Sequence, residues 1–494
     1  MRASGIFLHP TSLPSPYGIG DLGADARWWI DLLKNNYQSF WQICPLGPTG
    51  FGDSPYQTLC SFAGNTLLLS PDLLKEQNLL SDSDLSSFPK LSEEKVDFGT
   101  VIKEKEKLFR IAFQNFSDVP EFSVFCQEQH WWLHDYALFR VIKDNHDGKP
   151  WWQWNEKYRL RDKDALENVA QECSEQIRYY KFLQFVFNNQ WLSLKAYANE
   201  KRVRIVGDIP YYTAYDSSDT WSQPELFEIG KDGGLLRVAG VPPDYFSETG
   251  QLWGNPLYKW DVMKNNNYSW WAKRLGKMLQ WVDLIRLDHF RAFESYWAIP
   301  VQSQTAINGV WEKGPGIHFF ECMKEQLGDL PFIAEDLGDI TPEVLALREQ
   351  IGAPGMKILQ FAFDGNPLNP YLPYNVCFDS VTYTGTHDND TSLGWYINLP
   401  SIDKKRVRDY LGCTNKSFLK SFLRCAFASP SELCIVPFQD VLMLDSAHRM
   451  NTPGTQSGNW SWRFTKNMVE ESMLKRIYDY TLIYGRAGNS GHCL

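Results

Sequence analysis

Several features of other protein classes are missing from this 494-residue sequence, and each absence excludes a function. No run of 18 apolar residues occurs, so we expect no membrane-spanning helix. Lys and Arg together number 49 against 59 Asp and Glu, which gives a net charge of −10. Because nucleic-acid phosphates require a basic protein surface, this balance argues against a nucleic-acid partner.

Cysteine pairs with metal-binding or redox spacing are absent too. None of the ten cysteines forms a C-x-x-C pair, and Cys44, Cys425 and Cys434 lie in apolar runs. The first residues, MRASGIFLHPTSLP, contain no apolar stretch followed by a cleavage site, so we expect no secretory signal. We therefore predict buried free thiols and a cytoplasmic protein.

Histidine is scarce, with nine residues, and one pair, His130 and His134, has a metal-like spacing. A zinc protease would need a glutamate directly after the first histidine, where Trp131 stands. We therefore interpret the pair as surface residues and expect no metal there.

A glycine-rich loop near the N-terminus matches the dinucleotide-binding pattern G-x-G-x-x-G, with Gly18, Gly20 and Gly23. A nucleotide site needs a strand that leads directly into the glycines. Here PTSLPSP separates the apolar run 5–9 from them, and its prolines prevent the tight strand-to-helix turn. We interpret the segment as a rigid surface loop whose third glycine precedes a helix.

Aromatic residues, by contrast, are abundant: 20 tryptophans within a 15% aromatic content. Several lie in polar loops, namely KPWWQWNE, TGQLWGNP and SGNWSWRF. Because sugar rings have apolar C–H faces, aromatic rings in polar loops indicate a carbohydrate-binding surface.

Apolar, β-branched runs alternate with helical patterns along the chain. Eight such runs end in polar residues, at 5–9, 39–46, 202–210, 282–290, 331–338, 355–363, 380–388 and 433–440. Helical patterns between them include 23–36, 341–352 and 403–412. Eight βα units predict an α/β fold with a closed (β/α)8 TIM barrel, and an open doubly wound sheet is the alternative.

Two gaps between these runs are long enough to hold large inserted subdomains. The gap after the second strand holds a charged, helix-rich segment, about 67–200, and the gap after the third is rich in Gly, Pro, Asp and aromatic residues, about 211–262. We expect a single catalytic barrel over 1–494 that carries a helical subdomain and a lid-like loop subdomain.

Acidic residues follow four of the predicted strands, at the end where such a barrel gathers its chemistry. They are Asp208, Asp288, the pair Glu335 and Asp336, and Asp388, which follows His387. Converging carboxylates fit a magnesium or calcium site, or the two-carboxyl chemistry of glycoside cleavage. For any single acid, a structural salt bridge at the barrel rim is the simpler interpretation.

Arg286 favours glycoside chemistry. It lies two residues before Asp288, on the same side of a strand, so its charge would stabilise the ionised carboxylate that a nucleophile requires. Glu335 follows the apolar run PFIA, and partial burial would raise its pKa as a general acid requires. Because side chains alternate along a strand, only one of Glu335 and Asp336 faces the mouth, and the sequence leaves that choice open.

Four segments resemble the four short sequence regions of the α-amylase-like clan: GDIPYYTAYDSSDTW, IRLDHFRAF, FIAEDLG and GTHDND. Further segments are similar to one family of that clan, the 4-α-glucanotransferases (amylomaltases or disproportionating enzymes, glycoside hydrolase family 77). These are HPTSLPSPYGIGDLG, PLGPTGFGDSPYQ, GVPPDYFSETGQLWGNPLY and RMNTPGTQSGNWSWRF. The similarity runs from about residue 5 to 464 and is poorest around 70–125 and in the last thirty residues.

This resemblance implies roles for individual residues. Asp288 would be the nucleophile, Glu335 the acid/base, and Asp388 the acid that holds sugar hydroxyls and favours a distorted, oxocarbenium-like ring. Substrate-binding residues would be Tyr56, Asp208, Tyr245, Phe246, Gln251, Trp253, Arg286, Asp364, His387 and Asn459. The loop PDYFSETGQLW would form a lid over the bound glucan, and the family requires no metal or organic cofactor.

The implied reaction transfers α-1,4-glucan segments from a donor maltodextrin to the 4-hydroxyl of an acceptor glucan or glucose, with retention of configuration. Retention predicts that the two catalytic carboxyls lie about 5–5.5 Å apart. One alternative is an α-glucan hydrolase of the amylase or debranching type, and another is a catalytically inactive glucan-binding protein on the same barrel. We expect α-1,4-glucans, derived from maltodextrin, glycogen or starch, as the binding partners, with no membrane partner; the sequence leaves the oligomeric state open.

Overall fold

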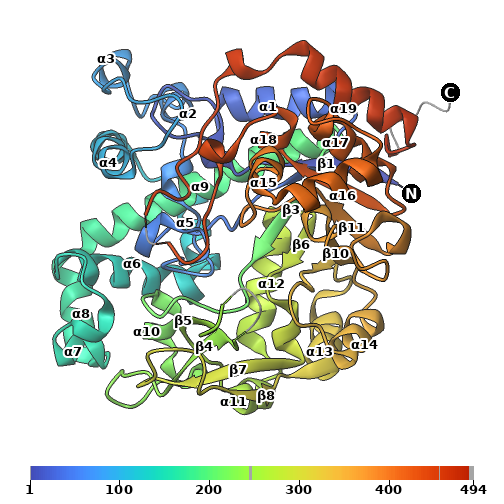
Figure 1. The fold of residues 1–494 in the computed structure, drawn as a ribbon. Helices are drawn as coiled ribbons and strands as arrows, with labels where there is room; N and C mark the ends of the chain where they lie inside the picture. Colours follow the sequence, from blue (N-terminus) through green and yellow to red (C-terminus); the bar gives the residue numbers. More distant parts are fainter. Residues whose placement is uncertain (1, 244–246, 456, 489–494) are drawn as a thin grey trace.

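The computed structural model describes residues 2–243, 247–455 and 457–488, and at its centre is a barrel of eight parallel strands (Figure 1). The strands are β1 (Ala3–Phe7), β2 (Phe40–Gln42), β3 (Arg204–Ile209), β6 (Leu284–Leu287), β9 (Phe332–Ala334), β10 (Gly355–Ile358), β11 (Ser380–Tyr383) and β12 (Leu433–Pro437). Their hydrogen-bonded order closes on itself as β1-β12-β11-β10-β9-β6-β3-β2. Every one of these strands overlaps a predicted run, so the predicted (β/α)8 barrel is confirmed.

Buried isoleucines stabilise five of these strands. Ile6, Ile205, Ile285, Ile333 and Ile435 are all fully buried. In a parallel barrel one face of each strand meets the packed interior and the other meets the surrounding helices, so apolar residues are favoured on both faces.

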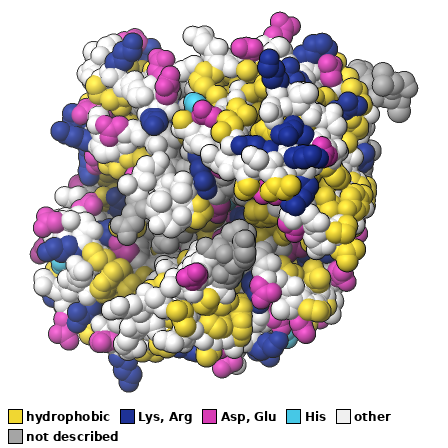
Figure 2. Space-filling view, in the orientation of Figure 1, with side chains coloured by type: hydrophobic (Ala, Val, Ile, Leu, Met, Phe, Trp, Pro, Cys, Tyr) yellow, Lys and Arg dark blue, Asp and Glu magenta, His cyan; other side chains and the backbone are white. Residues whose placement is uncertain are grey.

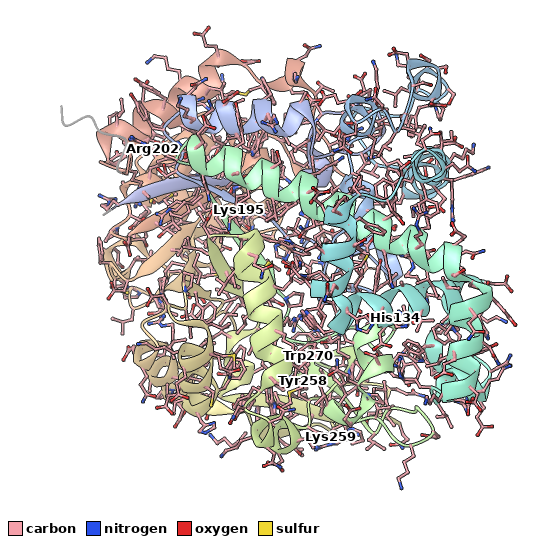
Figure 3. The ribbon with its side chains drawn as sticks, turned by 180° about the vertical axis from the view of Figure 1, so that it is seen from behind. His134, Lys195, Arg202, Tyr258, Lys259 and Trp270 are labelled. Atoms are coloured by element: carbon pink, nitrogen blue, oxygen red, sulfur yellow. The ribbon has the colours of Figure 1, made fainter. Side chains whose placement is uncertain are left out.

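Helices cover the outside of the barrel. They are α1 (Ala24–Asn35), α9 (Ser174–Glu200), α12 (Ser269–Trp281), α13 (Gly316–Leu327), α14 (Pro342–Gln350), α15 (Ser392–Asn398), α16 (Ser401–Leu411), α17 (Phe418–Ala428), α18 (Phe438–Val441) and α19 (Glu471–Ile483). The helical patterns at 23–36, 341–352 and 403–412 are confirmed as α1, α14 and α16. On the back of the molecule Lys195 of α9 donates to the carbonyls of Gln280 (3.1 Å) and Val282 (3.0 Å), which fixes the end of α12 to the long helix (Figure 3).

Between β2 and β3 the chain builds a group of helices beside the barrel, coloured blue to teal in Figure 1. They are α2 (Pro71–Glu76), α3 (Asp82–Ser86), α4 (Phe98–Gln114), α5 (Pro120–Glu128), α6 (His130–Asp144), α7 (Glu156–Arg159) and α8 (Lys163–Glu172). They occupy the segment predicted as a helical subdomain, which as a separate folding unit stays a prediction.

A four-stranded antiparallel sheet lies beside the barrel, and the sequence analysis did not predict it (Figure 1). Its strands are β4 (Arg237–Val241), β5 (Gln251–Pro256), β7 (Ser295–Pro300) and β8 (Val310–Lys313), in the order β5-β4-β7-β8. The first two belong to the predicted lid segment, where α10 (Ser218–Ser222) and α11 (Trp260–Asn265) also lie, and the last two follow β6. Strand β5, QLWGNP, contains residues that disfavour strands, and its pairing with β4 overrides that local preference.

The glycine-rich loop follows β1 and ends where α1 begins, with Gly23 as the helix N-cap. Its description as a surface loop is wrong, because residues 17–23 are buried under the segment that leads into α4. Gly18 has a φ of +71°, and a Cβ at Gly20 would lie 1.9 Å from the carbonyl oxygen of Pro10. Close packing against the rest of the protein therefore explains these glycines.

No helix within the described ranges is long and apolar enough to cross a membrane. Figure 2 shows a hollow near the middle of the face seen in Figure 1, between the barrel and the four-stranded sheet.

Candidate active site

Arg286 joins two of the predicted acids at the ends of the neighbouring strands β3 and β6. Its Nη1 lies 2.7 Å from Asp208 Oδ2 and 2.9 Å from Asp288 Oδ1. The guanidinium charge stabilises both carboxylates. The side chain of Asp208 is 1% exposed and that of Asp288 is 27% exposed, so of the two Asp288 is the one that a ligand can reach.

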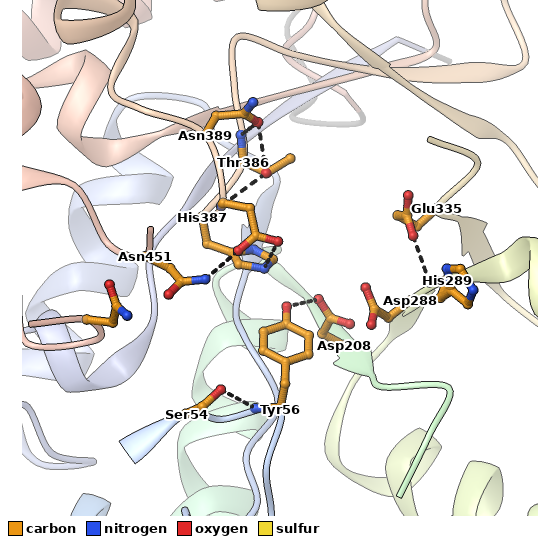
Figure 4. A network of polar contacts seen from close by, with 12 residues as sticks. Ser54, Tyr56, Asp208, Asp288, His289, Glu335, Thr386, His387, Asn389 and Asn451 are labelled. Atoms are coloured by element: carbon orange, nitrogen blue, oxygen red, sulfur yellow. Dashed lines mark hydrogen bonds and ion pairs between the residues drawn. The ribbon is translucent and has the colours of Figure 1, made fainter. Parts of the chain in front are cut away.

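Tyr56 connects this ion pair to the next part of the site (Figure 4). Its hydroxyl donates to Asp208 Oδ2 at 2.8 Å, and its ring stacks on the imidazole of His387 with centroids 5.0 Å apart. Burial raises the pKa of Asp208 to about 6, although the charge of Arg286 opposes that shift. The tyrosine hydroxyl and the guanidinium together hold one oxygen of this buried carboxylate.

Glu335 follows β9 directly and faces the site, whereas Asp336 does not. The carboxylate of Glu335 accepts hydrogen bonds from the backbone amides of His289 (2.7 Å) and Leu337 (3.0 Å). Asp336 is instead buried against Arg348, whose Nη1 lies 2.6 Å away. The alternation that the sequence left open is thus resolved: Glu335 lies beside the residue that follows Asp288.

The environment of Glu335 favours its neutral form. Burial raises its pKa to about 8, and the negative charge of Asp288 adds to this effect. The charge of Arg286 and the two amide hydrogen bonds act in the opposite direction but are weaker. A carboxyl of this kind is protonated at neutral pH and can donate a proton.

His387 and Asp388 lie in the loop between β11 and α15. Asp388 Oδ2 is 3.4 Å from His387 Nε2, and Asp388 Oδ1 accepts from Asn451 Nδ2 at 2.6 Å (Figure 4). Burial alone would raise the pKa of Asp388, but the charge of His387 and the hydrogen bonds from His387 and Asn451 outweigh it and lower that pKa. Asp388 is half exposed and ionised, so it is able to bind hydroxyl groups.

The predicted lid residues are only partly described. Tyr245 and Phe246 lie outside the described residues. The indole of Trp253, on β5, meets the imidazole of His289 edge-on with centroids 4.9 Å apart, and its Nε1 donates to Gln251 Oε1 at 3.1 Å. Trp253 therefore contacts the residue whose backbone amide binds Glu335.

Asp364 and Asn459, two of the predicted substrate-binding residues, make contacts within their own loops. Asp364 is exposed, and its carboxylate accepts from the backbone amide of Asn366 at 2.9 Å. Asn459 accepts from the amide of Thr452 (2.9 Å) and donates to the hydroxyl of Thr455 (3.0 Å). These contacts shape turns and do not join either residue to the acids.

Two residues of the site were missed by the sequence analysis. His289 has a left-handed backbone with a φ of +51°, which directs its amide to Glu335. Asn451 lies in RMNTPG, a segment that carried the resemblance, yet nothing in its spacing indicated a contact with Asp388, 63 residues away in sequence.

The metal-like pair His130 and His134 is occupied by protein contacts. The two rings stack with centroids 5.4 Å apart, and Lys181 Nζ lies 3.5 Å from His134 Nδ1. A metal there would have to displace the lysine ammonium. Within the described part of the chain, no group of three or more His, Cys, Asp or Glu side chains has the arrangement of a metal site.

The barrel and its two carboxyls in contrasting environments, one ion-paired and one neutral, are typical of enzymes that act on glycosidic bonds. Residues 8–468 match the family model of glycoside hydrolase family 77, described as 4-α-glucanotransferase. The chain belongs to this 4-α-glucanotransferase family and is an enzyme of that type.

Individual relatives agree with this family. The 4-α-glucanotransferase of Synechocystis is 46% identical and that of Thermus thermophilus 45% identical, with alignments that cover 98% and 94% of both chains, respectively. Among solved structures, the amylomaltase of Streptococcus agalactiae in complex with acarbose has a TM-score of 0.95 at 39% identity. The alignment covers 98% of this chain and 100% of the amylomaltase chain.

Proposed function

We propose that this protein transfers α-1,4-glucan segments by a retaining double displacement in which Asp288 is the nucleophile and Glu335 the acid/base. The observation that carries the assignment is the contrast between a partly exposed carboxylate paired with Arg286 and a neighbouring carboxyl with a raised pKa. The substrates are α-1,4-glucans such as maltooligosaccharides.

In the first step, Asp288 Oδ attacks the anomeric carbon of a glucose in the donor chain. The bond from that carbon to the glycosidic oxygen breaks, and Glu335 gives its proton to this oxygen, so the shortened glucan leaves with a new 4-hydroxyl. In the second step, the 4-hydroxyl of an acceptor attacks the same carbon, the bond to Asp288 breaks, and Glu335 takes the hydroxyl proton. Each step inverts the anomeric carbon, so the product keeps the α configuration.

The remaining polar residues hold the sugar ring between these two acids. Asp388, half exposed and ionised, binds ring hydroxyls and stabilises positive charge on the reacting sugar. His387 and Tyr56, stacked on each other, form the wall beside it. Arg286 holds the nucleophile in place through its ion pair with Asp288, and Asp208 binds the same guanidinium nitrogen.

Maltotriose distinguishes this function from its alternatives. A transferase converts it to glucose and a ladder of longer maltodextrins, and the total number of reducing ends stays constant. An α-glucan hydrolase forms new reducing ends without a ladder. A protein that only binds glucans leaves maltotriose unchanged, so chromatography of the products together with a reducing-end assay decides among the three.

The enzyme should lose activity at alkaline pH. Glu335 must be protonated to start the first step, so kcat/KM with maltotriose is expected to be full below the raised pKa and to fall as the pH rises through about 8. A pH series of initial rates measures this. A decline that begins near pH 5 would mean that the essential acid is not Glu335 in this environment.

Trp253 is expected to keep water out of the covalent intermediate. Trp253→Ala opens the side of the site next to His289, so hydrolysis should rise severalfold relative to transfer. The ratio is measured as new reducing ends per mole of glucan transferred. Trp311→Ala is the matched control, because Trp311 lies on β8, at the opposite edge of the same sheet. An unchanged ratio in Trp253→Ala would contradict the lid role.

The cysteines fit the proposed cytoplasmic location. The nine that the structure describes are all free thiols, which persist in a reducing compartment.

A further inference from the structure

Asp440 closes the base of the loop that carries His387 and Asp388. This loop, residues 384–392, connects β11 to α15. Thr384 at its start donates from Oγ1 to Asp440 Oδ2 at 2.6 Å. Ser392 at its end donates from Oγ to the same oxygen at 2.6 Å and from its backbone amide to Asp440 Oδ1 at 2.7 Å. One carboxylate therefore ties both ends of the loop together.

The three hydrogen bonds to Asp440 are buried. Thr384 and Ser392 are fully buried, and Asp440, in α18 directly after β12, is 1% exposed. A carboxylate offers about four acceptor positions, so it can accept three hydrogen bonds at once. All three donors belong to buried residues and have Asp440 as their acceptor.

The outer part of the loop is held by the segment that follows Asp440. Arg449 Nη2 donates to the backbone carbonyl of Asp388 at 2.6 Å, and the backbone amide of Asn451 donates to the backbone carbonyl of His387 at 3.1 Å. The segment 440–451 thus contacts the loop at its base and near its tip. These contacts set where the half-exposed carboxylate of Asp388 lies.

We infer that Asp440 is a positioning residue for the transfer reaction, which acts through the 384–392 loop and does not touch the substrate. The inference rests on the proposed role of Asp388. A transition-state contact loses most of its effect when it shifts by about 1 Å. If the two ends of the loop were not bound to Asp440, the loop could move at its base and shift Asp388.

The test first removes the hydrogen bonds of Asp440 and then restores hydrogen bonding with an uncharged side chain. Asp440→Leu keeps the branched shape of the side chain but is bulkier and has no acceptor, and kcat on maltotriose is expected to fall about 10- to 100-fold with KM nearly unchanged. Asp440→Asn should recover most of kcat, because its oxygen accepts from the Ser392 amide and its NH2 group donates to the two hydroxyls, which also accept. The loss in Asp440→Leu should persist with α-maltosyl fluoride, since that donor replaces the need for a general acid but not for Asp388.

Asp21 offers a matched control. It is also buried, accepts from a serine hydroxyl (Ser15, 2.7 Å) and a backbone amide (Gly23, 2.8 Å), and lies at the start of a helix. Asp21→Leu should lower Tm as Asp440→Leu does and leave kcat of the folded enzyme unchanged. If Asp440→Leu does not fold, Thr384→Val and Ser392→Ala, which each remove one donor, should each lower kcat at unchanged KM.

Three results would overturn the inference: an unchanged kcat in Asp440→Leu or in both donor variants, an Asn variant as impaired as the Leu variant, or an equal loss in Asp21→Leu. Asp388→Asn separates this inference from the function on which it rests. If Asp388→Asn retains transfer, the role of Asp388 fails; if it is inactive and Asp440→Leu is not impaired, only the positioning role fails.

Discussion

Asp288→Asn is expected to lower kcat on maltotriose by about 10⁴-fold or more while glucan binding remains measurable. The amide cannot form the covalent bond to the anomeric carbon, and no other carboxylate paired with Arg286 is exposed, because Asp208 is buried. The substitution keeps the shape of the side chain. Maltoheptaose binding, followed by quenching of tryptophan fluorescence, should therefore stay within a few-fold of the wild type.

Asp283→Asn is the control for this variant, because Asp283 lies just before the other end of the same strand. It accepts from the amide of Ile205 at 2.7 Å and from Asn199 Nδ2 at 3.1 Å, at the end of the barrel away from the site. Its loss should lower stability and leave kcat intact. Substantial transfer by Asp288→Asn would place the nucleophile elsewhere. Loss of maltoheptaose binding together with kcat would reduce Asp288 to a structural role.

The barrel could be predicted because its strands are specified locally. Each lies in a short, largely apolar run with a polar end, and eight such runs separated by helical patterns fit few other folds. The acids at the ends of β3, β6 and β9 could be found by the same logic, since parallel strands bring their carboxyl ends to one mouth. Arg286 and Asp288 share a face because they are two residues apart.

What could not be predicted depends on contacts between segments far apart in the chain. The choice of Glu335 over Asp336 is made by the His289 amide on one side and by Arg348 on the other. Asp440 ends the last predicted run, yet its partners, Thr384 and Ser392, are known only from the packing of two loops. The four-stranded sheet was missed because β5 contains glycine and proline, and because β4 pairs with β7, a strand from a distant part of the chain.

The carboxyl groups of Asp288 and Glu335 are held in different ways. Arg286 forms a direct ion pair with Asp288, whereas Glu335 is held by two neutral amides in a partly buried position that favours the protonated acid. Because the amide of His289 belongs to the residue after Asp288, the nucleophile and the acid are connected through one peptide unit. Because each carboxyl has its own partners, replacing one should leave the hydrogen bonds of the other in place.

Glu335→Gln tests this separation. With maltotriose as donor, kcat is expected to fall by about 10²- to 10⁴-fold, because the leaving glucan no longer receives a proton. With α-maltosyl fluoride, whose leaving group needs no protonation, the covalent intermediate should still form on Asp288. Azide, which needs no general base, should then attack it and yield α-maltosyl azide, detectable by mass spectrometry.

Asp336→Asn changes the neighbouring carboxyl in the same way and serves as the matched control. Its carboxylate is bound to Arg348 and to the amide of Met356 at 2.7 Å, away from the mouth, so its loss should lower Tm without changing the ratio of activities on the two donors. Equal losses on maltotriose and α-maltosyl fluoride in Glu335→Gln would show that the residue does not act as the acid. An azide product from Asp336→Asn in place of Glu335→Gln would move that role to the neighbouring position.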